Sequence, residues 1–249
     1  MIILKSKREI EKIRRSCRIV VEVLEALKER VRPGVTTWEL DALSEELAAK
    51  YGAVPAFKGY HGFPYALCTS INEEVVHGMP SRKRRLAEGD IISVDFGVLL
   101  DGYYGDAAVT VAVGDVSEAA RQLCRVTQES LGKAIEKTVP GNRLSDISHA
   151  VQAHVEYHGY SVVREFVGHG IGRSLHESPQ IPNYGPPGKG VKLKPGMVLA
   201  IEPMINEGGP EIEILDDGWT AVTRDRKLSA HYEHTVAINE NGPEILTVL

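Results

Sequence analysis

Apolar side chains recur at helical spacing in two neighbouring segments near the start of the chain. In residues 10–31 they return every three or four positions, and the Arg-Pro-Gly sequence at 32–34 ends the pattern. A second helix is expected to start at Thr36 or Thr37, either of which can cap it, and to run to Lys50. The pattern therefore predicts a pair of amphipathic helices joined by a Pro-Gly turn.

The same helix pair recurs later in the chain. Sliding the sequence by 107 positions, without a gap, aligns Cys17-Arg18 with Cys124-Arg125, Glu22 with Glu129, Leu24 with Leu131, Glu29 with Glu136, Pro33-Gly34 with Pro140-Gly141, and Gly52 with Gly159. Chance similarity between two amphipathic helix pairs is the alternative. We predict a single domain over residues 1–249 that contains two equivalent halves, about 1–114 and 115–249.

Residues 93–110 predict a β-hairpin with two acids on one face. Strand-like runs flank Asp101-Gly102, a dipeptide that favours a two-residue type I′ turn. The period-2 alternation then puts Asp95 and Asp106 on the same face. Two carboxylates there repel each other unless a cation lies between them, so a divalent metal is one interpretation. The other is that Asp95 is an exposed strand residue and Asp106 a loop acid.

Two further acids occur on strand-like segments of the second half. Glu202 follows an apolar run and precedes Pro203, which must stop strand pairing or sit at an edge or bulge. Glu233 is expected to share one strand face with Thr235. A two-fold repeat would bring Asp95, Asp106, Glu202 and Glu233 to a common axis between the halves. The helix pairs would then cover the opposite side of the sheet.

Composition narrows the class of protein. The net charge of −5 gives no reason to expect a nucleic acid as the main partner. No apolar run approaches the length of about 18 residues that suggests a membrane span, and no signal-peptide pattern is present, so a soluble cytoplasmic protein is expected. The cysteines are odd in number and lack Cys-x-x-Cys spacing, which excludes a disulfide framework and a thiolate zinc site.

Five motifs, in order over nearly the whole chain, resemble the type I methionine aminopeptidases. They are TSINEEVVHGMP at 69–80, Asp95 with Gly105-Asp106, GHGIGR at 168–173 with HESPQ at 176–180, AIEPM at 200–204, and SAHYEHT at 229–235. The resemblance implies an α+β pita-bread fold of the creatinase/aminopeptidase type, whose curved antiparallel sheet has pseudo-two-fold halves covered by two helix pairs. It also implies an enzyme that removes the initiator methionine from nascent proteins and peptides, preferring a small second residue.

The resemblance further implies a dinuclear metal centre. Its ligands would be Asp95, Asp106, His169, Glu202 and Glu233, with Asp106 and Glu233 bridging two divalent ions. Four carboxylates balance the charge of two dications. Ligation by carboxylates and one imidazole, without a thiolate, favours manganese, iron or cobalt over a structural zinc site, and the sequence does not choose among the three.

Catalytic and substrate-binding roles are likewise implied by the resemblance. Glu202 would carry the proton of the attacking water, although it could also serve as a ligand alone. His176 would stabilise the developing oxyanion and His77 the amide side, where plain hydrogen-bonded loop histidines are the alternative. The methionine side chain would occupy an apolar slot. The matching positions are Tyr60, Phe63, Cys68, Leu175 and Trp219, with Phe57 nearby; Leu175 and Phe57 depart from the side chains common in the family.

The remaining histidines have weaker assignments. His231 shares the face of Glu233 and could support the metal centre, whereas His234 points the other way. The others are expected to be structural or exposed. They are His61, His149, His154 and His158.

Two competing functions remain. Prolidases and aminopeptidase P, which share the fold, carry a long domain before the first aspartate, whereas only 94 residues precede Asp95. A non-catalytic pita-bread protein would bind a partner in the cleft, but all five ligands and both substrate histidines are retained here. The short interval from His169 to Glu202 leaves no room for the insertion of type II enzymes.

A monomer is expected. The basic run at 82–85 is interpreted as a solvated loop, and a transient ribosome contact through it is a hypothesis.

Overall fold

The computed structural model describes residues 2–248, and its four helices form the two predicted pairs. The helices are α1 Lys7–Arg30, α2 Thr37–Lys50, α3 Glu118–Glu136 and α4 Leu144–Tyr157. Ser6 caps α1 and Thr36 caps α2, each in a capping box with the glutamate three residues later. The predicted end of the second helix at Lys50 is confirmed, and the first helix begins three residues earlier than its apolar pattern.

The offset of 107 residues relates more than the helices. It carries the bounds of α2 onto those of α4, and it also carries the first residue of strand β4, Ile91, onto the first residue of β9, Val198. The same offset relates Asp95 to Glu202. Asp95 lies within β4, and its counterpart Glu202 directly follows the end of β9 at Ile201.

The strands form antiparallel sheets. They are β1 Val54–Pro55, β2 Cys68–Ile71, β3 Glu74–Val76, β4 Ile91–Leu100, β5 Tyr103–Ala112, β6 Ser161–Val162, β7 Gly168–Gly170, β8 Glu177–Ile181, β9 Val198–Ile201, β10 Met204–Asn206, β11 Ile212–Ile214, β12 Ala221–Thr223, β13 Ser229–His231, β14 His234–Asn239 and β15 Gly242–Ile245. One sheet joins β1, β4 and β2, with β5 beside β4, and another has the order β15-β14-β9-β7-β8. Two three-stranded sheets, β13-β10-β6 and β11-β12-β3, complete the architecture.

The β4–β5 hairpin has the predicted register. Leu100 pairs with Tyr103 and Gly97 with Asp106. Asp101 and Gly102 have φ values of 50° and 79°, as a type I′ turn requires. Asp95 and Asp106 consequently lie on the same face of the ribbon.

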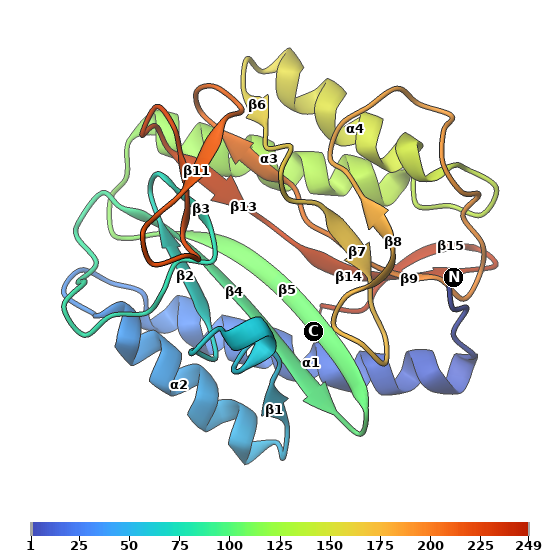
Figure 1. Ribbon diagram of the computed structural model, residues 1–249, viewed down its shortest axis with the longest axis horizontal. Helices are drawn as coiled ribbons and strands as arrows, with labels where there is room; N and C mark the ends of the chain where they lie inside the picture. Colours follow the sequence, from blue (N-terminus) through green and yellow to red (C-terminus); the bar gives the residue numbers. More distant parts are fainter. Residues whose placement is uncertain (1, 249) are drawn as a thin grey trace.

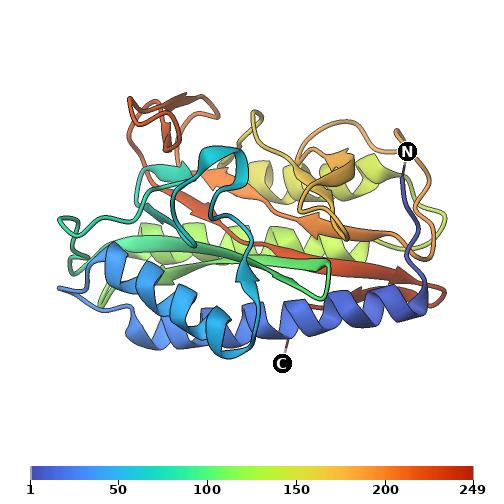
Figure 2. The same ribbon diagram turned by 60° about the horizontal axis from the view of Figure 1, so that its bottom comes forward.

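Each helix pair covers the strands of its own half. Helix α1 packs on β4 and β5 with α2 beside it, whereas α3 packs on β9 and β13 with α4 beside it (Figures 1 and 2). Two buried apolar clusters fill these interfaces, one around Leu27 and Phe96 and the other around Leu123 and Leu199. Burial of apolar surface in each cluster is the main force that fixes the strands and therefore the acids they carry.

One strand prediction is wrong. The run from His231 to Ala237 is broken, because β13 ends at His231 and β14 begins at His234. Glu233 lies in this break, where its backbone N–H donates to the carbonyl of Ala108 in β5 at 2.9 Å. The predicted stop at Pro203 is confirmed, since it separates β9 from β10. Across residues 2–248, none of the helices has the length and apolar character needed to span a membrane.

Candidate metal centre and substrate cavity

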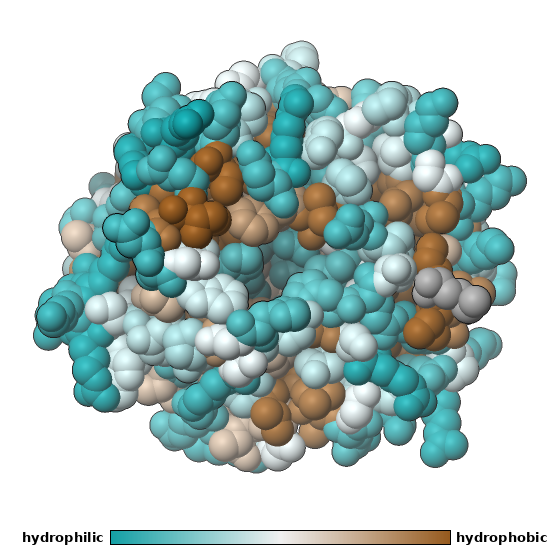
Figure 3. All heavy atoms as spheres, in the orientation of Figure 1, coloured by the Kyte–Doolittle hydropathy of each residue, from teal (hydrophilic) through white to brown (hydrophobic). Residues whose placement is uncertain are grey.

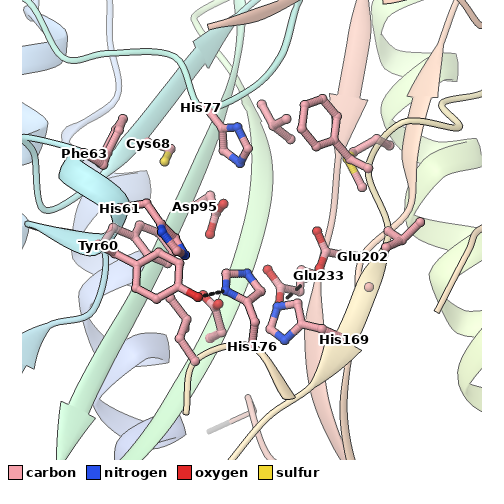
Figure 4. Close-up of a pocket in the computed structure, with 18 of the residues that line it drawn as sticks. Tyr60, His61, Phe63, Cys68, His77, Asp95, His169, His176, Glu202 and Glu233 are labelled. Carbon is pink, nitrogen blue, oxygen red and sulfur yellow. Dashed lines mark hydrogen bonds and ion pairs between the residues drawn. The ribbon is translucent and has the colours of Figure 1, made fainter. Parts of the chain in front are cut away.

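A cavity of about 670 Å³ receives side chains from both halves of the chain. Figure 3 shows it as a hollow near the centre of one face, with a hydrophobic patch beside it. Every site residue expected from the sequence lines this cavity. In Figure 4, Asp95 points into it from one half and Glu202 and Glu233 point into it from the other. The four acids therefore meet between the halves, as the repeat predicted.

Within residues 2–248, several carboxylate oxygens in this cavity have no hydrogen-bond partner. Asp106, His169 and Glu233 each present one ligand atom within 4.8 Å of the others. Among residues 2–248, buried oxygens of Asp95, Asp106 and Glu233 accept no hydrogen bond. Unpartnered buried oxygens are costly, so their accumulation is a feature that a bound cation explains.

The acidity of the four carboxyl groups is shifted in the same direction. Burial raises the pKa of Asp95 to about 7. Burial first, and then repulsion from neighbouring carboxylates, raises the pKa values of Asp106, Glu202 and Glu233 well above the ordinary range. The protein therefore holds these negative charges at an energetic cost, which divalent cations would offset.

His169 is presented to the carboxylates as a neutral imidazole. Its Nδ1 lies 2.9 Å from the carbonyl oxygen of Gly170, to which it donates, and its Nε2 lies 3.4 Å from Oε1 of Glu202. Burial lowers the pKa of His169 to about 3. The Nε2 lone pair is therefore free for a metal ion, and the backbone carbonyl fixes the tautomer.

Glycines on both sides of His169 allow the strands to approach it. A Cβ on Gly168 would lie 2.5 Å from the carbonyl oxygen of Ala200, and one on Gly170 would lie 2.4 Å from that of Ser178. Any larger residue would push β7 away from β8 or β9. The Gly-His-Gly sequence thus places the imidazole between its two neighbouring strands.

Two further histidines face the cavity near the metal-ligand candidates. His176 Nδ1 is hydrogen-bonded to the Tyr60 hydroxyl at 2.7 Å, and its ring centroid lies 4.2 Å from that of His169. His77 packs edge-on against Phe166. Burial, followed by the proximity of His176, lowers the pKa of His77 to about 4, so it is neutral at pH 7. In Figure 4, His176 lies between Tyr60 and His169, and His77 lies above Asp95.

The apolar end of the cavity is built from aromatic and aliphatic side chains. Phe63 packs edge-on against Trp219 with ring centroids 5.2 Å apart, and Leu175 is buried. Cys68 pairs with Asp95 across β2 and β4. Asp41 holds the loop that carries Phe63, since its Oδ1 accepts hydrogen bonds from the N–H groups of Ala66 and Leu67 at 2.9 and 3.0 Å.

The structure adds detail to two histidine assignments. His61, expected to be structural or exposed, is exposed; it also lines the cavity beside Tyr60 and has a φ of 49°. His231 approaches Glu202 rather than Glu233, with Nε2 3.9 Å from Oε2. The prediction for His234 is confirmed, because it turns away and contacts the Thr247 hydroxyl at 2.8 Å.

The chain is similar to known proteins over its full length. Residues 11–240 match the model of metallopeptidase family M24. A methionine aminopeptidase of Clostridium acetobutylicum is 58% identical over 100% of this chain and 99% of that protein. Methionine aminopeptidase 1 of Bacillus subtilis is 54% identical over 99% of each chain. The chain belongs to the methionine aminopeptidases of metallopeptidase family M24. Members of this family are metal-dependent, so this chain is a metal-dependent aminopeptidase.

Solved structures of the family confirm the fold. A methionine aminopeptidase from Thermotoga maritima has 51% identity, covers 100% of both chains and gives a TM-score of 0.99. A prolidase from Pyrococcus furiosus has 28% identity and a TM-score of 0.80 over 99% of this chain and 66% of that one. The pita-bread fold is therefore confirmed, and the identities favour methionine aminopeptidases over the prolidase alternative.

Proposed function

We propose that this chain hydrolyses the first peptide bond of peptides and nascent proteins that begin with methionine and have a small second residue. Two divalent cations, manganese, iron or cobalt, would be held by Asp95, Asp106, His169, Glu202 and Glu233, with Asp106 and Glu233 bridging. The observation that carries the proposal is the convergence of four carboxylates and a neutral imidazole with unpartnered oxygens among residues 2–248.

In this proposal Glu202 transfers a proton. When bound, divalent cations activate a water molecule as the nucleophile and polarise the scissile carbonyl. Glu202 lies among the metal-ligand candidates, with Oε1 beside His169 and Oε2 facing His231. Its carboxylate accepts the proton of the water and returns it to the leaving amine.

His176 has a free donor for the developing negative charge. His176 Nδ1 and the Tyr60 hydroxyl are 2.7 Å apart, and we assign the hydroxyl as the donor, which puts the proton of the neutral ring on Nε2. Nε2–H can then donate to the carbonyl oxygen as charge builds on it. His77, which packs edge-on against Phe166 at the cavity wall, would contact the amide side of the scissile bond.

The apolar end of the cavity explains the preference for methionine. Phe63, Leu175 and Trp219 form a wall against which a flexible thioether chain can pack, together with Tyr60 and Cys68. The free amine of the substrate would bind near the ion held by Asp95. A charged side chain in this slot would lose its hydration without gaining a partner.

We further infer that residues 1–249 act as one catalytic domain, monomeric and cytoplasmic, with halves at about 1–114 and 115–249. The run at 82–85 is exposed, with Arg82 stacked on Trp38 and Arg84 paired with Glu74. A transient ribosome contact through this run would suit an enzyme that acts on nascent chains. Replacing the four charges should reduce co-sedimentation with ribosomes; unchanged co-sedimentation would exclude this contact.

A peptide assay tests the proposed function. The metal-loaded protein should release methionine from Met-Ala-Ser and leave Xaa-Pro dipeptides intact, and metal analysis of the same sample should find divalent ions. Cleavage of Xaa-Pro dipeptides in place of Met-Ala-Ser would indicate a prolidase. Failure to cleave either class, in a sample with full metal content, would indicate a binding protein.

A further inference from the structure

We propose a second metal site, separate from the cavity, on the surface of the α3–α4 helix pair. It is formed by Glu129 of α3 and by His154 and His158 at the end of α4. One ligand atom from each of the three residues lies within 4.8 Å of the other two. The two helices run side by side in Figure 1, so an ion here would bridge them.

The spacing of the two histidines suits chelation. His154 and His158 are four residues apart, which places both rings on one face of the helix. Their ring centroids are 4.8 Å apart. Two imidazoles and one carboxylate form a donor set that zinc accepts in open sites, where water takes the fourth position. Glu129 and His158 are exposed, so water has access to that position.

Glu129 is already oriented toward the imidazoles. Its Oε2 lies 3.1 Å from His154 Nε2, while its Oε1 faces Arg125 Nε at 4.0 Å. One oxygen is thus engaged by a guanidinium and the other faces the site. A divalent ion would replace the proton shared between Glu129 and His154. The two side chains would stay in the same orientation toward each other.

The first helix pair provides an internal comparison. The offset of 107 residues places Glu22, Leu47 and Tyr51 at the positions of Glu129, His154 and His158. There a hydrogen bond to Glu22 raises the pKa of the Tyr51 hydroxyl, and Leu47 packs against the core. In the first helix pair, a hydrogen bond and an apolar contact thus occupy the positions that the histidines occupy in the second. Packing of a helix pair does not require the two histidines.

Binding at this site would stabilise the protein without entering the reaction. None of the three residues lines the cavity. An ion that binds only the folded chain stabilises it by mass action, since it ties α3 to α4. At a zinc concentration of about 100 times Kd, the melting temperature should rise by roughly 5–10 °C.

Zinc binding by three forms of the holoenzyme tests the site. The wild type is compared with His158→Gln and with His149→Gln, which removes an exposed histidine of the same helix outside the cluster. After equilibrium dialysis against low-micromolar zinc, the wild type and His149→Gln should carry one more ion than His158→Gln. Exchange of zinc into the cavity would affect all three forms alike. The difference in zinc content between the forms therefore reports binding at the surface site.

Thermal unfolding supplies the second measurement. Zinc should raise the melting temperature of the wild type and of His149→Gln more than that of His158→Gln. Before zinc is added, the two variants should turn over a methionyl peptide at equal rates. Equal zinc content in all three forms would overturn the proposal. So would a loss of zinc from His149→Gln equal to that from His158→Gln.

Discussion

The Thr235 hydroxyl donates a hydrogen bond to the carbonyl oxygen of Asp106 at 2.7 Å, across 129 positions of sequence. The same hydroxyl accepts from the Asp106 N–H at 3.3 Å. Both residues are buried, and Thr235 lies two positions after Glu233. This pair of bonds therefore fixes the backbone of one bridging-ligand candidate relative to the other.

Replacing Thr235 by Val should weaken metal binding as well as the fold. The change keeps the shape of the side chain but leaves the Asp106 backbone groups unpaired in the interior, at a cost of about 1–3 kcal/mol in the free energy of unfolding. Urea unfolding and metal titration measure the two effects. Thr223→Val is a matched control, because the buried Thr223 hydroxyl bonds the Lys227 carbonyl away from the cavity. Equal metal affinity in both variants would contradict the proposed role of Thr235.

Replacing His176 by Ala should slow hydrolysis without removing metal. The variant lacks the Nε2–H donor proposed for the oxyanion, which predicts a loss of about 10²–10³ in kcat. Tyr60→Phe should cause a smaller loss, since it removes only the hydroxyl that sets the tautomer of His176. Steady-state kinetics and metal analysis are measured on the same samples. Loss of metal from His176→Ala would instead make this residue a ligand.

The side-chain slot should select by polarity and length. Phe63, Leu175 and Trp219 offer apolar contacts, so a peptide with N-terminal norleucine should be cleaved at a rate close to that of its methionine counterpart. Peptides that begin with Asp or Lys should be poor substrates. Comparable kcat/KM values for the charged and apolar peptides would show that the assigned slot does not bind the first side chain.

The start of α1 should make stability depend on pH. Hydrogen bonds, first from the Ser6 N–H and then from the Ser6 and Tyr103 hydroxyls, lower the pKa of Glu9 to about 2. A carboxyl group with a lowered pKa stabilises the fold above its unfolded pKa, and this contribution is lost as pH falls toward the folded value. Glu9→Gln should therefore cost about 1 kcal/mol at pH 7, a figure reduced for partial exposure, and progressively less below about pH 4.5.

Urea unfolding between pH 3 and pH 7 measures this difference. Glu11→Gln is the control, because Glu11 lies on the exposed face of the same helix and pairs with Arg14 outside the cap. A deficit in Glu9→Gln that is constant across this range would mean that the carboxylate charge has no part in the cap.

Much of the fold could be predicted because it depends on local signals. The Asp101-Gly102 turn fixes the hairpin register, and the period of two then puts Asp95 and Asp106 on one face. The offset of 107 residues indicated two similar halves before any contact was known. A two-fold relation between the halves also predicted that their acids would meet, although the offset itself matches Asp95 with Glu202 and does not match Asp106 with Glu233.

The wrong strand prediction, and the contacts that local pattern could not reveal, depend on tertiary packing. The strand through Glu233 is broken because its N–H pairs with Ala108 of the other half, which no local spacing reveals. His61 enters the cavity through a left-handed backbone conformation in an irregular loop, a feature without periodicity. The approach of His231 to Glu202 depends on the pairing of β10 with β13.

Removal and return of metal test the central claim most directly. Protein stripped of metal and assayed on Met-Ala-Ser under reducing, anaerobic conditions should be inactive. Activity should return as manganese, iron or cobalt is added back, and it should reach its maximum when the cavity holds two ions per chain. Stripped protein that still releases methionine, or full activity that returns without any ion bound, would contradict the assignment of Asp95, Asp106, His169, Glu202 and Glu233 as a metal centre.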